Sequence, residues 1–369
     1  MSVVQATTRA ELNEFLDYPY RKYRGVKGWV APLRISQREL IDPKKNPFWD
    51  HARGVFFLAK DDSGRTVGRV ALIDDDVHNQ THDDNIAFFG FFEAESEVVA
   101  KALMAAVENR AQALGRVAVR GPVNPTMNDG AGFQLGAFDE PPYVMMPQNP
   151  PEYPQWMEAA GFAKVKDLYT FYFDTVKPFD ERVGRLADRS RSRYSPVVRP
   201  ADMKRFNEEV RVLKEIHEAS WEKNWGNVPF TDAEIDHLAS ELKMIVEPEM
   251  ALFLEHQGRP IGICIAVPDL NQVLARFDGR LFPFGIFHLL RRKKIINRAR
   301  LVMLGVLPEF RNRGFDLLLI QEVVRRAKAI GIVGGECGWT LEDNHSINRA
   351  IEAAGGVRNK TYRMYQKSL

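Results

Sequence analysis

The chain has 369 residues, more than one hydrophobic core usually organises, so we expect two domains of ordinary size. Its 51 Lys and Arg nearly balance its 49 Asp and Glu, which excludes a protein whose whole surface binds a polyanion. Two cysteines exclude a disulfide framework and a zinc site with four cysteine ligands. The N-terminal residues carry no secretory signal pattern, so we expect a cytoplasmic protein. We also expect no bound metal.

The first half of the chain reads as an ordered series of helices and strands. An opening helix over residues 7–23 precedes a β-hairpin over 55–74 and a strand ending at 88–93. A helix that closes at Gly115 follows, and then a short strand, a short helix ending at Gly161 and a last strand over 167–173.

The second half repeats this order. Two helices are predicted in residues 202–248, the second opened by a capping box from Thr231 to Glu234. A hairpin over 250–269, a strand over 303–309 and a helix closing at Gly331 come next. A strand, a short helix ending at Gly355 and a last strand complete the second copy, with Asn344 opposite Asn128 of the first.

The repeat predicts the fold class and the domains. We expect a mixed α/β chain of two tandem domains, each with a central, mostly antiparallel sheet flanked by helices. The predicted boundaries are an N-terminal domain over 1–175, a polar, Arg-rich linker over 176–200 and a C-terminal domain over 201–369.

A glycine- and arginine-containing loop joins strand to helix in the second copy. It runs Val306-Leu-Pro-Glu-Phe-Arg-Asn-Arg-Gly-Phe315, and the chain here resembles the GNAT superfamily of N-acyltransferases. In that superfamily the backbone N–H groups of such a loop and the helix dipole bind the pyrophosphate of a CoA thioester. The resemblance implies donor-binding roles for these residues: Leu304, Val306, Arg311, Asn312, Arg313, Gly314, Phe315 and Asn344. The alternative interpretation is that the loop binds no ligand and is only a strand-to-helix turn with solvated arginines.

Two departures from the superfamily pattern affect the chemistry. Asp316 stands where Gly or Ala is usual, which indicates either a turned-away helix cap or a preference for a carrier-bound phosphopantetheine arm over CoA. Ile351 stands where many members carry a tyrosine that acts as the general acid and protonates the departing thiolate. The hypothesised catalytic residues are therefore nearby titratable groups, each of which also reads as a solvated or structural side chain: Glu309, Glu342, His345 and Tyr362, with Asp343 and Tyr365 as further options.

The first copy lacks the loop. Glu93, Glu95 and Glu97 occupy the corresponding stretch, and three carboxylates repel a phosphate. We therefore expect only the second copy to bind the donor, which is a co-substrate rather than a permanently bound cofactor. The first copy is expected to be structural and to form walls of the acceptor site.

An insertion in the second copy suggests the acceptor. Residues 276–300 combine an apolar run over 281–290 with eight cations: Arg276, Arg280, Arg291, Arg292, Lys293, Lys294, Arg298 and Arg300. Such a segment suits a peripheral contact with an anionic membrane surface, or equally the docking of an acidic acyl carrier protein. A buried hairpin with a solvated basic end is the plainer alternative.

Further segments resemble a bacterial subgroup of double-GNAT proteins that includes the bacterial ceramide synthases. This resemblance implies transfer of a long acyl group from a CoA or carrier-protein thioester to a sphingoid-type lipid amine. Acetylation of a small amine or peptide, and an inactive GNAT-like binding protein, remain the alternatives. The expected location is cytoplasmic, at most peripheral on the inner membrane face.

Other constellations favour structural roles. The acid- and His-rich stretch 74–84 matches no metal-ligand spacing and is predicted to be a solvated loop. The Arg189–Ser195 run has no accompanying aromatic platform, so no nucleic-acid partner is expected. Trp221 and Trp225 are predicted to be core residues or walls of the acceptor pocket.

Overall fold

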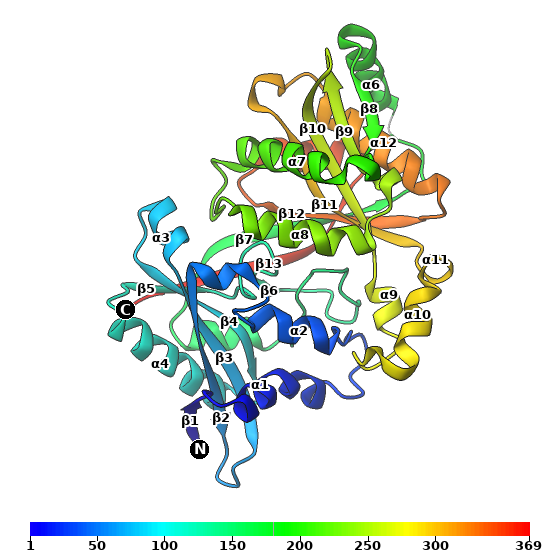
Figure 1. Cartoon of the computed structure of the whole chain (residues 1–369). Coiled ribbons are helices and arrows are strands. Elements are labelled where there is room, and N and C mark those ends of the chain that lie inside the picture. The colour runs from blue at the N-terminus through cyan, green and yellow to red at the C-terminus, as the bar shows by residue number, and fades with distance from the viewer. Residues whose placement is uncertain (180) are drawn as a thin grey trace. The chain divides into compact units, whose positions relative to one another are not determined.

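The computed structural model describes residues 1–179 and 181–369 (Figure 1). The chain forms two compact units. Unit 1 comprises residues 1–168, 274–286 and 361–369, and unit 2 comprises residues 169–273 and 287–360. The predicted two-part α/β organisation is thus present, although the divisions fall at other residues.

Unit 1 is a sheet with helices packed on it. Its strands lie in the order β1-β2-β3-β4-β5-β13, with β6 paired to β13, and β4 and β5 are parallel. The strands native to the first copy are β1 (Ser2–Gln5), β2 (Ala52–Lys60), β3 (Thr66–Asp75), β4 (Ile86–Ala94), β5 (Ala118–Gly121) and β6 (Phe133–Gln134). The helices are α1 (Arg9–Lys22), α2 (Arg34–Ile41), η1 (Pro47–Asp50), α3 (Asp76–His82), α4 (Glu97–Ala113) and α5 (Tyr153–Ala159).

Unit 2 repeats this plan. Its strands lie in the order β7-β12-β11-β10-β9-β8, and β11 and β12 are the parallel pair. The strands are β7 (Ala163–Asp174), β8 (Val197–Pro200), β9 (Ala251–His256), β10 (Arg259–Pro268), β11 (Arg298–Val306) and β12 (Gly334–Leu341). The helices are α6 (Glu181–Tyr194), η2 (Met203–Arg205), α7 (Phe206–Trp221), α8 (Asp232–Ile245), η3 (Pro248–Met250), η5 (Pro308–Phe310), α12 (Phe315–Ala329) and α13 (His345–Ala353). The Thr231–Glu234 capping box forms at the start of α8 as predicted.

The last strand of each repeat joins the other unit's sheet. Residues 169–174 of β7 belong to unit 2, where β7 neighbours β12. Residues 361–368 of β13 (Val357–Ser368) belong to unit 1, where Tyr365 pairs with Gly121 and Ser368 with Ala118 of β5. The expectation that each copy is closed by its own strand is therefore wrong. Alternation of apolar residues predicts a strand but does not specify its partner.

The predicted linker over residues 176–200 contains a helix and a strand, with residue 180 outside the described residues. Residues 181–194 form α6 and residues 197–200 form β8, both within unit 2. Val183, Ala187 and Ser190 form a buried stripe along α6 at helical spacing. The high arginine content masked this short apolar stripe in the sequence.

The insertion in the second copy adds short helical elements between β10 and β11. They are α9 (Asn271–Leu274), the π-helical turn η4 (Leu281–Gly285), α10 (Ile286–Leu290) and α11 (Arg292–Ile295). In the first copy, the single helix α3 occupies the corresponding connection between β3 and β4.

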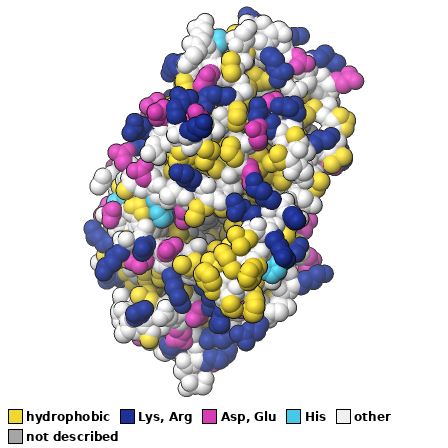
Figure 2. All heavy atoms as spheres, turned by 45° about the vertical axis from the view of Figure 1, so that its right-hand side comes forward, with side chains coloured by type: hydrophobic (Ala, Val, Ile, Leu, Met, Phe, Trp, Pro, Cys, Tyr) yellow, Lys and Arg dark blue, Asp and Glu magenta, His cyan; other side chains and the backbone are white. Residues whose placement is uncertain are grey.

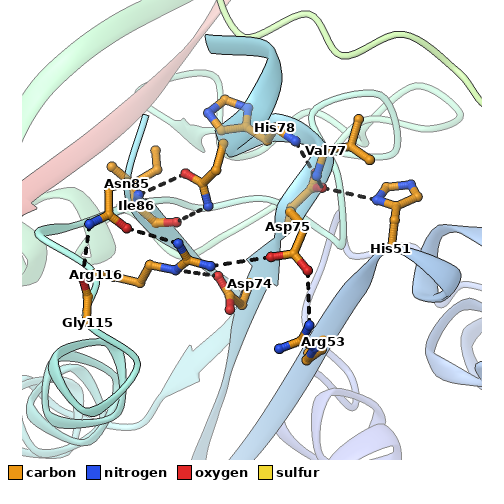
Figure 3. A network of polar contacts seen from close by, with 12 residues as sticks. His51, Arg53, Asp74, Asp75, Val77, His78, Asn85, Ile86, Gly115 and Arg116 are labelled. Carbon is orange, nitrogen blue, oxygen red and sulfur yellow. Dashed lines mark hydrogen bonds and ion pairs between the residues drawn. The ribbon is translucent and has the colours of Figure 1, made fainter. Parts of the chain in front are cut away.

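The acid- and His-rich stretch 74–84 is not a solvated loop. It forms the end of β3 and helix α3, with Asp74, Asp75 and His78 buried (Figure 3). Arg116 donates to Asp74 at 2.8 Å, and Asp75 accepts from the N–H groups of Val77 and His78, which caps α3. These internal partners explain the density of acids, and the described residues include no group of three or more His, Cys, Asp or Glu able to hold a metal ion.

Candidate functional site

Strands β11 and β12 separate partway along their length. Their parallel ladder runs from the pair Arg298–Gly334 to the pair Leu301–Cys337. Beyond that pair the following residues of both strands line a cleft of about 410 Å³ within unit 2. The opening of the sheet therefore creates the site, at the carboxyl ends of two parallel strands.

The cleft has a mixed lining. The strands contribute Leu301, Val302, Leu304, Gly305, Val306, Cys337, Gly338, Trp339, Thr340 and Leu341. The rest comes from the end of α7, the loop after β11, and α13: Ser220, Trp221, Asn224, Phe310, Arg311, Asn312, Phe315, Asp316, Asn344, Ser346, Ile347 and Ile351.

Two backbone amides of β11 face the open side of the sheet. The Leu307 N–H donates to the Ile261 carbonyl at 2.9 Å, and the register pairs Val306 with Gly262 and Leu304 with Cys264. Because hydrogen bonding alternates along an antiparallel ladder, the N–H groups of Val306 and Leu304 point away from β10. These donors are placed to bind an acceptor atom in the cleft, such as a carbonyl oxygen.

The loop after β11 turns at a strand-to-helix corner, as predicted. Gly314 precedes the first residue of α12 with φ of 77°, a left-handed conformation that favours glycine. Ser190 of α6 packs against this glycine, since a Cβ built there would lie 3.6 Å from the Ser190 Cβ. The N-terminus of α12 and its unpaired N–H groups thus begin beside the cleft residues Asn312 and Phe315.

The two loop arginines are held by internal contacts. Arg311 donates to the Ser220 carbonyl at 2.8 Å and to the Val306 carbonyl at 3.3 Å, so it ties the end of α7 to the end of β11. Arg313 donates to the Glu309 carbonyl at 3.1 Å and lies over the rings of Phe310 and Tyr194. Of the two, only Arg311 lines the cleft.

An aromatic wall closes the side of the cleft next to β11. The Trp221 ring lies across Gly305, where a Cβ would come within 2.4 Å of it. His217 stacks on Trp221 with ring centroids 4.6 Å apart and an interplanar angle of 14°. Burial lowers the pKa of His217 to about 4, so this histidine is neutral at physiological pH.

The structure brings six of the eight predicted donor-binding residues together. Leu304, Val306, Arg311, Asn312, Phe315 and Asn344 line the cleft. Arg313 and Gly314 lie in the same loop but face Tyr194 and α6 instead. Asp316 and Ile351, the two departures from the superfamily pattern, also line the cleft.

None of the four predicted catalytic residues lines this cleft. Glu309 is exposed and pairs with Arg259 at 3.2 Å. Glu342 and His345 lie in the turn between β12 and α13, next to the lining residues Leu341, Asn344 and Ser346. Tyr362 is fully buried in unit 1, where β13 pairs with β6.

Sequence reasoning missed several polar lining residues. Ser220, Asn224, Thr340 and Ser346 belong to the cleft, and the Ser220 hydroxyl is buried with no hydrogen-bond partner among the described residues. No sequence motif marks Ser220, although it immediately precedes Trp221, whose predicted role as a pocket wall is consistent with its position. Burial raises the pKa of Cys337 to about 12, so its thiol remains protonated in the cleft.

In unit 1 the stretch that replaces the loop is held by internal cations. Glu93 is buried and accepts from Lys22 at 3.1 Å and from Tyr153 at 2.7 Å. Glu95 pairs with Arg65 and Glu97 with Lys101. The first copy thus uses this stretch for structural contacts, consistent with the expectation that it does not bind the donor.

Comparison with known proteins places the chain. No protein-family model matches it. It is 33% identical over 380 residues, covering 100% of this chain and 98% of the relative, to the bacterial ceramide synthase of Caulobacter vibrioides. The chain belongs to the family of that enzyme. A second relative, protein YghO of Escherichia coli, is 31% identical over 367 residues, covering 97% of this chain and 93% of the relative.

The fold agrees with this assignment. A tandem GNAT protein from the clavulanic acid biosynthesis pathway superposes with a TM-score of 0.57 at 12% identity, covering 100% of this chain and 98% of that one. The predicted GNAT resemblance is confirmed, and the chain is an acyltransferase with a tandem GNAT fold. Among the described residues, no helix is both long and apolar enough to span a bilayer.

Proposed function

We propose that this acyltransferase moves a long acyl group from a CoA or carrier-protein thioester to the primary amine of a long-chain lipid of the sphingoid type. The observation that carries the proposal is the opened β11/β12 pair, with two backbone N–H groups directed into a cleft. Ceramides are N-acylated sphingoid bases, so the name of the Caulobacter relative supports the same acceptor.

The cleft suits direct transfer between thioester and amine. The Val306 N–H is placed to donate to the thioester carbonyl oxygen, which becomes an oxyanion as the amine nitrogen attacks the carbonyl carbon. Collapse of this intermediate forms the amide C–N bond and breaks the C–S bond. The amine loses a proton and the departing thiolate gains one, so the step balances without an oxidant or reductant.

Two groups are proposed to handle these protons and the sulfur. Glu342, beside the cleft in the β12–α13 turn, accepts the amine proton through water. The Ser220 hydroxyl, buried in the lining and otherwise unused, donates a hydrogen bond to the departing sulfur. Because burial keeps Cys337 protonated, its thiol is a poor nucleophile, which favours direct transfer from the thioester to the amine.

The exposed inserted segment supports a lipid acceptor. Phe282, Phe284, Phe287 and Leu290 are 72%, 75%, 58% and 72% exposed, an unusual number of large apolar side chains on one short stretch. Figure 2 shows hydrophobic side chains gathered beside Lys and Arg on this face of the molecule. The plainer reading of a buried hairpin does not fit these exposures.

Fewer cations of this segment are available to contact a lipid surface than the sequence suggested. Arg298 pairs with the buried Asp269 at 2.8 Å, and Arg300 is buried and donates to the Gly338 carbonyl. The exposed cations without an ion pair among the described residues are Arg276, Arg280, Arg291 and Lys294. Each contributes about 1 kcal/mol near an anionic lipid surface, which is consistent with peripheral contact at the inner membrane face.

One assay tests the reaction. The purified chain is incubated with a long-chain acyl-CoA and a sphingoid base, and both CoA release and amide formation are measured. We expect turnover with long-chain donors and lipid amines. Preference for acetyl-CoA with small amines, or donor binding with no turnover across a panel of long-chain amines, would contradict the proposal.

A second experiment tests the membrane contact. The double variant Phe284→Ser/Phe287→Ser is expected to lose co-flotation with vesicles containing anionic lipid. Val98→Ser is a matched control, since Val98 is 68% exposed on α4. Equal flotation of the double variant and the wild-type chain would overturn this part of the proposal.

A further inference from the structure

An arginine stripe runs along the outer face of α6. Arg182, Arg185, Arg189 and Arg193 are exposed and follow one another at spacings of three or four residues, so they lie on one side of the helix. The buried residues Val183, Ala187 and Ser190 lie on a different face. The stripe extends over about 16 Å, from a rise of 1.5 Å per residue.

The acids of α6 do not neutralise this stripe. Glu181 pairs with Arg185 at 3.2 Å, while Arg189 and Arg193 make no ion pair with any described residue. Asp188, three residues after Arg185, borders the stripe but adds only one negative charge beside four arginines, whereas Arg191 lies on the opposite flank of the helix. Leu186, on the stripe side, is 47% exposed, so the surface combines cations with an apolar side chain.

The stripe adjoins the loop that borders the cleft. The Ser190 Cβ and the Leu186 carbonyl oxygen would contact a Cβ placed at Gly314. The guanidinium carbons of Arg193 and Arg313 both lie near the Tyr194 ring, at 5.4 and 5.5 Å from its centroid. The Tyr194 ring packs in turn on Phe315, a cleft-lining residue, at 5.5 Å.

The shape and chemistry of this surface point to a protein partner. No residue of α6 lines the cleft, and the outside of a helix is convex, whereas small ligands are held in concave sites. A linear row of cations around an exposed leucine complements an acidic helix with an apolar contact. The Asp316 carboxylate in the cleft also makes the loop a poorer site for a diphosphate than for the single phosphodiester of a carrier-bound arm.

We propose that the arginine stripe of α6 docks an acidic acyl carrier protein, whose phosphopantetheine arm then reaches the β11/β12 cleft with the acyl thioester. This inference rests on the proposed acyl transfer and names the source of its donor. It also gives a role to the Arg-rich run over residues 189–195.

Direct binding tests the docking separately from the chemistry. A fluorophore-labelled holo acyl carrier protein of fatty-acid synthesis, carrying no acyl group, is titrated with the full chain while anisotropy is recorded. We expect Arg185→Glu/Arg189→Glu to weaken binding at least about tenfold, since reversing charges at an interface both removes attraction and adds repulsion. Arg191→Glu, a charge reversal on the opposite flank of the same helix, is expected to change the Kd by less than about twofold.

Transfer assays with two donors complete the test. The double variant is expected to keep the wild-type rate with acyl-CoA and to lose it with the acyl carrier protein at subsaturating concentration. Carrier binding that is absent in the wild-type chain, unchanged in the double variant or equally weakened by Arg191→Glu would overturn the docking. So would stripe-dependent binding of duplex DNA or anionic vesicles in place of the carrier. Turnover with acyl-CoA alone would leave the proposed function standing, whereas carrier binding without turnover of either donor would contradict that function only.

Discussion

Both units contain the same strand-helix-strand motif, but only in unit 2 do the two parallel strands of the motif separate to form a cleft. Gly90 of β4 and Gly305 of β11 occupy matching places before the first helix of each motif. In unit 1 the N–H of the next residue, Phe91, donates to Asn124 Oδ1 at 2.6 Å. In unit 2 the matching N–H, that of Val306, points into the cleft. The amide that we propose binds the thioester oxygen in one repeat thus has its counterpart satisfied internally in the other.

The backbone after β5 fills the corresponding position in unit 1. The Val123 N–H donates to the Phe89 carbonyl at 2.9 Å, and a Cβ on Gly90 would lie 1.6 Å from the Val123 oxygen. Buried backbone donors without partners are costly, so closing the sheet stabilises unit 1. In unit 2 no such contact forms at Val306 among the described residues, and under the proposed function its amide is left available for a substrate oxygen.

Removing the Val306 N–H tests this difference between the units most severely and is expected to have the largest effect. Val306→Pro removes the donor without removing a bond to β10, and the preceding Gly305 tolerates a proline. We expect kcat to fall by about 10²–10³-fold, as for the loss of other oxyanion donors. Donor binding and the melting temperature serve as controls for folding, and an unchanged kcat would remove Val306 from the mechanism.

Removing the internal acceptor of unit 1 is expected to affect stability instead. Asn124→Ala leaves the Phe91 N–H without its partner and is expected to lower the free energy of unfolding by about 1–3 kcal/mol. Chemical denaturation provides the measurement. We expect kcat to remain within about twofold, since the proposed reaction takes place in the cleft of unit 2. A large loss of kcat in a folded variant would show that unit 1 takes part in the chemistry.

Removing the contacts that hold the loop between β11 and α12 is expected to weaken donor binding. Arg311→Ala removes the bonds to the Ser220 and Val306 carbonyls, and we expect KM for the thioester to rise about tenfold, the loss of one charged hydrogen-bonding group. Arg259→Ala is the control, because Arg259 is an exposed arginine that pairs with Glu309 outside the cleft. Similar KM values for the two variants would argue against a role for Arg311.

The last prediction concerns the pH dependence of stability and involves no change in catalysis. Burial lowers the pKa of His217 in unit 2 and of His78 in unit 1 to about 4 in each case, below the ordinary value of about 6.5. The unfolded chain therefore binds these protons between about pH 6.5 and 4 while the folded chain does not. Stability must decrease as pH falls through this window, by up to about 1.4 kcal/mol per pH unit for each histidine.

Variants separate the two histidines. His217→Phe retains a ring that can stack on Trp221 and is expected to reduce the loss of unfolding free energy between pH 7 and pH 5 relative to the wild-type chain. Denaturant titrations at the two pH values measure this loss. If the variant and the wild-type chain lose equal stability, His217 is not buried in its neutral form.

Local patterns predicted much of this arrangement. The repeated hairpins, the helices closing at Gly115 and Gly331, and the corner at Gly314 follow from periodicity and turn residues. Five of the predicted donor-binding residues, from β11 to the first residue of α12, also line one cleft. Each of these features depends on residues close together in the sequence.

The missed features depend on distant contacts. The exchange of β7 and β13 between units is set by strand pairing, which alternation alone does not encode. Asn124 and Ser220 are placed by contacts between residues far apart in the sequence: the Phe91 N–H donates to the Asn124 side chain, and the Arg311 side chain donates to the Ser220 carbonyl. Helix α6 was predicted to be a linker because only three of its residues are buried, and they stand among many arginines.

Hydrogen–deuterium exchange with a non-hydrolysable long-chain acyl-CoA thioether tests the central claim most directly. If unit 2 alone holds the donor, the amides of residues 301–318 and 337–347 gain protection on binding, while those of 86–97 and 118–130 do not change. Protection of the unit 1 segments, or none at 301–318, would contradict the account.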